Sequence, residues 1–169
     1  NSILRRLSTI KNDTQTSILV FVGFLTLSCV ATFPAAINLT SSLIGHQQGD
    51  SYEMMWIIWW LKKSLFNTGL AVVNIPVLFH PYGITLPLLN TQIGAHLLAL
   101  PFASLYNVIS AYNIMMILSL ALSGTTAYLL GMALTGNRLA SAMCGLVWAF
   151  FPNKMGHALS GHLYQVAVF

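Results

Sequence analysis

The sequence predicts an all-α fold, a polytopic transmembrane helix bundle with interfacial juxtamembrane helices in a long first external loop. Hydrophobic residues make up 56% of the 169 residues, and the mean hydropathy is +0.74. A soluble globular domain does not need so apolar a composition, whereas a membrane bundle does. Charged residues account for only 6%, and they separate apolar segments long enough to cross a bilayer. We expect residues 1–169 to form a single membrane domain, the N-terminal part of a longer chain.

The first predicted span covers residues 17–37, which carry no charge. At 1.5 Å per residue this segment measures about 31 Å, which matches the hydrocarbon core of a bilayer. It is longer than the apolar region of a signal peptide, so we expect a retained anchor. Arg5, Arg6 and Lys11 precede it, and the positive-inside tendency therefore places the N-terminus in the cytoplasm.

The predicted external loop, residues 38–109, contains two of the three acidic residues of the chain, Asp50 and Glu53. A carboxylate at mid-bilayer would be unfavourable by about 2.5–3.5 kcal/mol, so we expect both at the membrane surface. On a helix, their spacing of three residues places both side chains on one face. Two interpretations are open at this point: a solvated surface loop, or a catalytic or ion-binding site.

The rest of this loop is predicted to lie outside the membrane or along its surface. The apolar run at residues 54–61, bounded by a Lys–Lys pair, is too short to span, and its three tryptophans predict an interfacial helix. Turn residues recur from 74 to 87 and predict irregular external backbone, which includes His80. The apolar segment 88–106 can either span or lie on the surface, and the distribution of Lys and Arg does not decide between the two.

Two further spans are predicted at residues 110–134 and 139–152, and another begins near residue 163. The 110–134 segment would measure about 37 Å, enough to cross with some tilt. Small residues recur at every fourth position within it, a pattern that favours close approach of a neighbouring helix. They are Ser119, Ser123, Ala127 and Gly131.

Several classes of function find no support in the sequence. The seven Lys and Arg residues are scattered too sparsely for a nucleic-acid surface, so we expect no nucleic-acid partner. Cys29 and Cys144 fall inside apolar segments and are expected to be core thiols rather than a disulfide. No Walker, Rossmann, CxxC or HExxH pattern occurs, so nucleotide, redox and zinc-protease chemistry lack a motif.

The order of the motifs resembles the N-terminal module of the GT-C superfamily, polytopic glycosyltransferases that use polyprenyl-phosphate-linked sugars. The shared features are a basic-flanked first helix, an acidic motif opening the external loop, juxtamembrane helices, a Pro-rich segment and a long helix ending in a polar turn. The motifs that carry the resemblance are residues 49–53, 79–83, 134–138, 151–152, 156–157 and 161–162. The pattern looks closest to bacterial members, which implies a bacterial inner (plasma) membrane.

The resemblance implies transfer of a sugar from a polyprenyl-phosphate donor at the outer face of the membrane. It assigns Asp50 as catalytic base or metal ligand, with Glu53 beside it. Related oligosaccharyltransferases keep an acidic motif in the second external loop, whereas this chain has His157 and His162 there. The phosphate of the donor would need positive charge, supplied by Lys154, a protonated histidine or a metal ion.

The same residue set suggests a divalent metal ion as cofactor, with Asp50, His157 and His162 as ligands. His80 is a further candidate for binding the donor, although most histidines in such a turn are structural. The expected partners are membrane lipid and the polyprenyl-phosphate sugar donor.

A non-catalytic alternative is an accessory transmembrane subunit of a larger membrane complex of the respiratory or photosynthetic type. Other membrane subunits would then be its partners. The small number of charges favours this alternative. His96, His157 and His162 could ligate a pigment or haem, but their spacing is not specific to that role.

Overall fold

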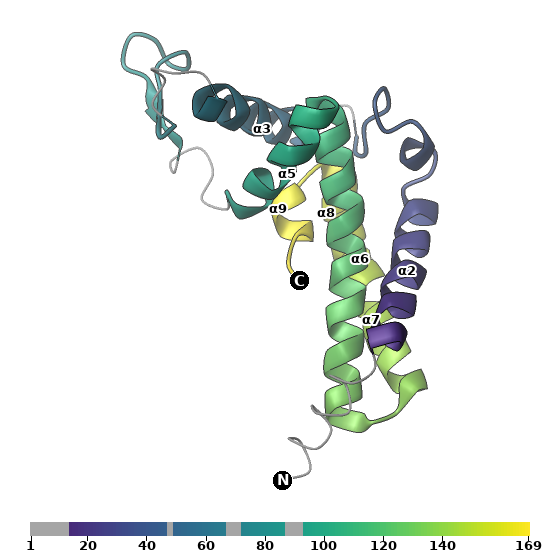
Figure 1. The fold of residues 1–169 in the computed structure, drawn as a ribbon. Coiled ribbons are helices and arrows are strands. Elements are labelled where there is room, and N and C mark those ends of the chain that lie inside the picture. Colours follow the sequence, from purple (N-terminus) through teal and green to yellow (C-terminus); the bar gives the residue numbers. More distant parts are fainter. Residues whose placement is uncertain (1–13, 47–48, 67–71, 87–92) are drawn as a thin grey trace.

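The computed structural model describes residues 14–46, 49–66, 72–86 and 93–169. These residues are mostly helical, which confirms the all-α class (Figure 1). In chain order the elements are α2 (Thr14–Ala31), η1 (Ala35–Ile37), α3 (Ser51–Phe66), β1 (Asn74–Ile75), β2 (Ile84–Thr85), α5 (Gly94–Leu105), α6 (Val108–Thr135), α7 (Arg138–Phe150), α8 (Pro152–Ser160) and α9 (Leu163–Val166). The two strands form a small antiparallel hairpin within the Pro-rich loop that was predicted to be irregular.

The long helix α6 is the centre of the molecule. Its 28 residues carry no charge, and it extends about 42 Å. Among the described residues it is the one helix long and apolar enough to cross a membrane. The Asn107 side chain accepts a hydrogen bond from the Ser110 amide at 2.7 Å at the start of α6, and Gly136 ends the helix with a φ of 66°. Figure 1 shows α2 and α7 alongside α6, and α3 across its N-terminal end.

Glycines allow α2, α6 and α7 to approach closely around Phe24. A Cβ atom at Gly124 of α6 would overlap the Phe24 ring, and one at Gly145 of α7 would lie 2.6 Å from the Gly124 carbonyl oxygen. Farther along the same helices, a Cβ atom at Gly131 would lie 2.9 Å from the Cα atom of Ser141. Close packing on α6 therefore occurs at the predicted Gly131, and also at Gly124, which the predicted stripe does not include.

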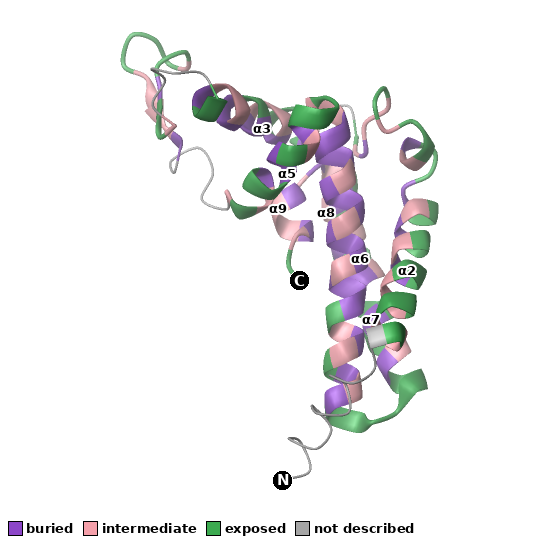
Figure 2. Cartoon of the chain, viewed as in Figure 1, coloured by how far each residue is buried: buried purple, intermediate pink, exposed green. Residues whose placement is uncertain are grey.

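The first helix ends earlier than the predicted span 17–37. α2 stops at Ala31, and a turn and the short helix η1 follow. Pro34 explains this, because proline lacks an amide donor and disfavours helical backbone at the residue before it. The outward face of α2 carries large exposed apolar side chains (Figure 2): Ile18, Leu19, Val22, Leu27 and Val30.

Another proline separates α7 from α8. Phe151 has extended backbone, with φ −65° and ψ 152°, and Pro152 then begins α8. The predicted span 139–152 therefore corresponds to α7 plus the start of a second helix, and the chain continues along α6 after the break. The segment predicted to begin a new span near residue 163 forms α9, a helix of four residues.

The amphipathic helix α3 packs on α5 at the N-terminal end of α6. Its buried face includes Ile57, Ile58 and Leu61, whereas Trp59 is exposed. This helix contains the interfacial helix predicted from the tryptophans and extends beyond it at both ends. α5 has 12 residues, about 18 Å, which is too short to span. The described part of segment 88–106 therefore fits the surface-lying alternative.

Candidate functional site

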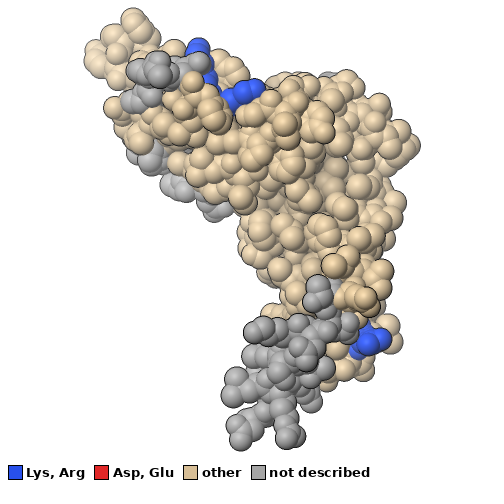
Figure 3. Space-filling view, in the orientation of Figure 1, with Lys and Arg blue, Asp and Glu red and all other residues tan. Residues whose placement is uncertain are grey.

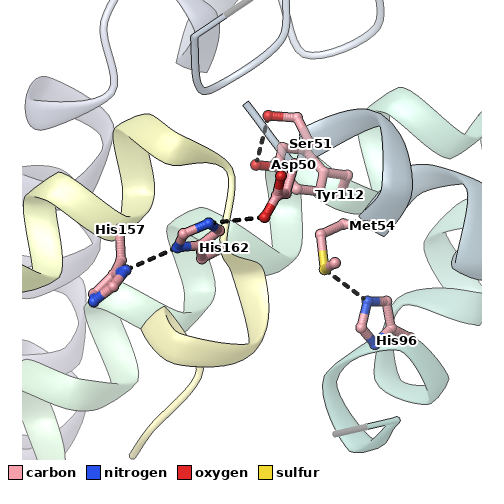
Figure 4. Close-up of polar contacts among 7 residues, drawn as sticks. All are labelled: Asp50, Ser51, Met54, His96, Tyr112, His157 and His162. Atoms are coloured by element: carbon pink, nitrogen blue, oxygen red, sulfur yellow. Dashed lines mark hydrogen bonds and ion pairs between the residues drawn. The ribbon is translucent and has the colours of Figure 1, made fainter. Parts of the chain in front are cut away.

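Three predicted site residues form one hydrogen-bonded chain near the N-terminal end of α6 (Figure 4). The Nε2 atom of His162 lies 2.9 Å from Oδ2 of Asp50. The Nδ1 atom of His162 lies 2.8 Å from Nδ1 of His157. The Asp50 side chain is 50% exposed and that of His162 is 24% exposed. The carboxylate is therefore open to a ligand, while the ring behind it is mostly enclosed.

The contacts of His162 define the direction of these hydrogen bonds. An ionised Asp50 only accepts, so Nε2 of His162 carries a proton and donates to it. In neutral His162, Nδ1 then accepts from the Nδ1–H group of His157, an assignment that follows from the network. In both hydrogen bonds of this series, from His157 to His162 and from His162 to Asp50, the donor is on the side away from Asp50. This arrangement orients the Asp50 carboxylate and leaves Oδ1 without a hydrogen-bond partner among the described residues.

Backbone contacts between the segment before α3 and the end of α8 bring the site together. The Asp50 amide donates to the Ser160 carbonyl oxygen at 2.8 Å, and the His46 amide donates to the Leu159 carbonyl oxygen at 2.6 Å. Gly161 has a φ of 82°, and a Cβ atom there would overlap the start of α3. A glycine at this position is what allows the two backbones to meet.

A polar pair on α6 holds the loop that leads to Asp50. The Tyr112 hydroxyl donates to the Ile44 carbonyl oxygen at 3.0 Å. The Asn113 amide group donates to the carbonyl oxygens of Leu39 at 2.9 Å and Ser42 at 2.6 Å, and its Oδ1 accepts from the Ile44 amide at 3.0 Å. The sequence prediction missed these two positioning residues. The sequence feature that could have identified them is the adjacent pair Tyr112 and Asn113, two polar side chains within a largely apolar segment.

Glu53, in the first turn of α3, shares the surroundings of Asp50. Partial burial, and then the Asp50 carboxylate, raise the pKa of Glu53 above its usual range, while His162 lowers it. The Glu53 side chain keeps much of its surface exposed, so its carboxyl group lies at the protein surface and is only partly buried. The shift is in the direction that a general base needs, and Glu53 is a candidate for that role together with Asp50.

The structure does not bring Lys154 or His80 to this cluster. Lys154 is 3% exposed, and its Nζ atom donates to Ser123 Oγ at 2.8 Å and to the Val168 carbonyl oxygen at 3.3 Å. Lys154 precedes His157 by three residues in α8, so it lies about 4.5 Å nearer the middle of α6. His80 is exposed in the turn between β1 and β2, in the hairpin beyond the far end of α3 (Figure 1). Donor binding by Lys154 and His80 therefore stays a prediction that the contacts of the Asp50 cluster do not support.

The predicted metal ligands do not converge on one point. A metal ion needs its ligands around a common centre. Asp50 and His157 instead contact opposite edges of the His162 ring, so the three donors form a line. No group of three His, Cys, Asp or Glu side chains is placed to hold an ion in the described part of the chain. The contacts described are those of a hydrogen-bonded chain, and the divalent metal ion stays a prediction.

His96 lies apart from the other two histidines considered as pigment or haem ligands. It is fully buried in α5, and its Nε2 atom is 3.3 Å from Sδ of Met54 (Figure 4). The three histidines therefore do not form one ligand site.

No protein-family model matches this chain, and no curated protein or solved structure matches it either. A functional proposal therefore depends on the geometry of the Asp50 cluster and on the resemblance of the motifs that meet there.

Proposed function

We propose that this chain is an integral membrane protein in which α2, α6 and the α7–α8 pair form a polytopic bundle. The length and composition of α6 and the exposed apolar face of α2 support this. α7 and α8 together return along α6, since Ser141 lies beside Gly131 and Lys154 reaches Ser123. In this arrangement α3 and α5 lie at one membrane surface as juxtamembrane helices.

We also propose that the Asp50 cluster transfers a sugar from a polyprenyl-phosphate donor at the outer face of the membrane. The observation that carries this proposal is the contact of Asp50 with His162 at 2.9 Å. It joins the acidic motif of the first loop to the second Gly-His motif, and both motifs belong to the resemblance to the GT-C superfamily. The joined motifs make one polar site beside apolar helices, where a lipid-linked substrate has access.

In the proposed reaction a carboxylate, Asp50 or Glu53, takes the proton of an acceptor hydroxyl group. The acceptor oxygen forms a bond to the anomeric carbon of the sugar as the bond from that carbon to the phosphate oxygen breaks. The electron pair of the broken bond leaves with the polyprenyl phosphate. His162 holds Asp50 in position through Nε2, and His157 fixes the orientation of the His162 ring.

The test uses membranes that contain the full chain, a panel of polyprenyl-phosphate monosaccharides and a fluorescent acceptor. Asp50→Asn keeps the shape of the side chain and removes its basicity, so transfer should fall about 100-fold or more. Arg138→Gln changes the charge at the opposite end of α6 and should keep wild-type transfer. Undiminished transfer by an Asp50→Asn, Glu53→Gln double variant would contradict the proposal. A wild-type chain inactive with the whole panel would favour the accessory-subunit alternative.

A further inference from the structure

A second site lies at the opposite end of α3 from Asp50. An open groove of about 410 Å³ is lined by Trp59, Lys62, Lys63, Phe66 and Val108. Among the described residues that line it, the walls are aromatic and aliphatic and the charged groups are the two ammonium groups. We propose that this groove binds the phosphate headgroup of an anionic membrane lipid.

Both lysines are held at the groove by contacts that leave donors free. The Nζ atom of Lys62 donates to the Ala103 carbonyl oxygen at 2.7 Å. The Nζ atom of Lys63 lies 4.7 Å from the centre of the Trp59 ring. An ammonium group has three donors, so each lysine can still donate to a phosphate oxygen. Two cations, one held by a backbone carbonyl oxygen and the other over an aromatic ring, are suited to a fixed anion.

No described carboxylate compensates this charge. The described acidic residues, Asp50 and Glu53, lie at the other end of α3. The helix separates Glu53 from Lys62 by about 14 Å. Figure 3 shows basic side chains over the α3 end of the molecule and no acidic atoms on that face. The groove therefore attracts an anion.

The groove lies at the depth of lipid headgroups when α6 crosses a membrane. Val108, which forms part of its wall, is the first residue of α6. With α6, about 42 Å long, centred on a hydrocarbon core of about 30 Å, this first residue lies at the level of the headgroups. Trp56, Trp59 and Trp60 cluster on α3 with ring centroids 6.0 to 6.4 Å apart, and tryptophan is enriched at this level. Lysines there extend their ammonium groups toward the headgroups.

The apolar lining distinguishes a lipid from a soluble anion. Phe66 and Trp59 offer apolar surface beside the two cations, which suits the glycerol and acyl chains that adjoin a lipid phosphate. Free phosphate has no group to place there. This inference rests on α6 crossing a membrane, and it is independent of glycosyl transfer because the Asp50 cluster takes no part in it.

The test measures which lipids the full chain retains in native mass spectrometry. The protein is released from vesicles with equal amounts of phosphatidylglycerol and phosphatidylcholine of the same acyl chains. The wild-type chain should retain phosphatidylglycerol preferentially. Lys62→Gln and Lys63→Gln should each lower this preference about fivefold, because each removes one cation beside the headgroup. Arg138→Gln is the matched control, since it removes one cation at the far end of α6 and should keep the preference.

Lys63→Gln leaves the Lys62–Ala103 hydrogen bond intact, so it decides the question if Lys62→Gln does not fold. Equal retention of the two lipids by the wild-type chain would overturn the proposal, as would an equal loss of preference in Arg138→Gln. An excess of soluble glycerol 3-phosphate should leave the bound lipid in place. Displacement by it would show that the groove selects phosphate alone, and would overturn the assignment to a lipid.

Discussion

Gly161 packs so closely on Ser51 that a methyl group in place of an α-hydrogen would overlap the Ser51 side chain and backbone. The φ of Gly161, 82°, also lies in the left-handed region that side chains disfavour. This contact joins the end of α8 to the start of α3, directly beside the Asp50–His162 pair. The geometry of the candidate site depends on it.

Gly161→Ala should lower the free energy of unfolding by about 1–3 kcal/mol, because it adds backbone strain and a steric overlap. Denaturant titration in detergent measures the change. Gly156→Ala in α8, the helix that Gly161 ends, is the control, since its Cβ atom would meet nothing within 4 Å. The control should be neutral or stabilising by about 0.5–1 kcal/mol. Equal destabilisation by the two variants would show that the Gly161 contact has no special importance.

Gly124→Ala should also destabilise the protein by about 1–3 kcal/mol, because the added methyl group would overlap the Phe24 ring and push α2 away from α6. Gly23→Ala, next to Phe24 on α2, has open space around its Cβ atom and serves as the control. The same titration compares the two. A harmless Gly124→Ala would mean that α2 does not dock at this position.

Glu53 gives folding stability a pH dependence whose sign follows from its raised pKa. A carboxyl whose pKa is higher in the folded state binds its proton more tightly there, so this contribution is fully present below the unfolded-state pKa. It is lost as the pH rises from about 4 through the raised pKa. Glu53→Gln should therefore be more stable than wild type at neutral pH, by a small margin because the side chain is largely exposed. Unfolding measured at several pH values checks this, and a margin that does not shrink in acid would contradict it.

The proposed orientation predicts that the two ends of α6 are labelled from opposite sides of the membrane. Tyr52 and Leu139 are suitable probe positions, with side chains 59% and 74% exposed. A membrane-impermeant maleimide outside intact cells should modify Tyr52→Cys and not Leu139→Cys, in a chain with Cys29 and Cys144 replaced by Ala. Reversed labelling would contradict the orientation. Modification of both would contradict the crossing of α6.

Local sequence signals predict the central helix well. The expected range 110–134 lies within α6, whose ends carry a capping Asn107 and a terminating Gly136. The end of α2 and the break before α8 are harder to predict. Pro34 and Pro152 mark both places, but a proline in an apolar segment can also kink a membrane helix without ending it. Only the packing of the neighbouring helices decides between these outcomes.

The motifs predict Asp50, His157 and His162 as site residues, but they do not predict how the three side chains are connected. Their order in the chain of hydrogen bonds depends on which edge of the His162 ring faces α8, and this is a property of tertiary structure. Lys154 shows the same difficulty. It is close to His157 in sequence, yet it turns toward Ser123 on α6.

The lipid groove could not be found from a local pattern either. Lys62 and Lys63 follow the tryptophans in sequence, but Val108 comes from a helix that begins much later in the chain. Two basic residues after an apolar run are also the usual flank of any interfacial helix. The groove forms only because the end of α3 lies near the start of α6 in the folded protein.

The hydrogen bond from the Asp50 amide to the Ser160 carbonyl oxygen has a consequence for how the protein is made. At about 5–20 residues per second, a ribosome adds Ser160 on the order of ten seconds after Asp50. Tyr112 and Asn113, which hold the loop before Asp50, are also synthesised before Ser160. The loop that leads to Asp50 therefore has its contacts on α6 available before His157 and His162 have been synthesised.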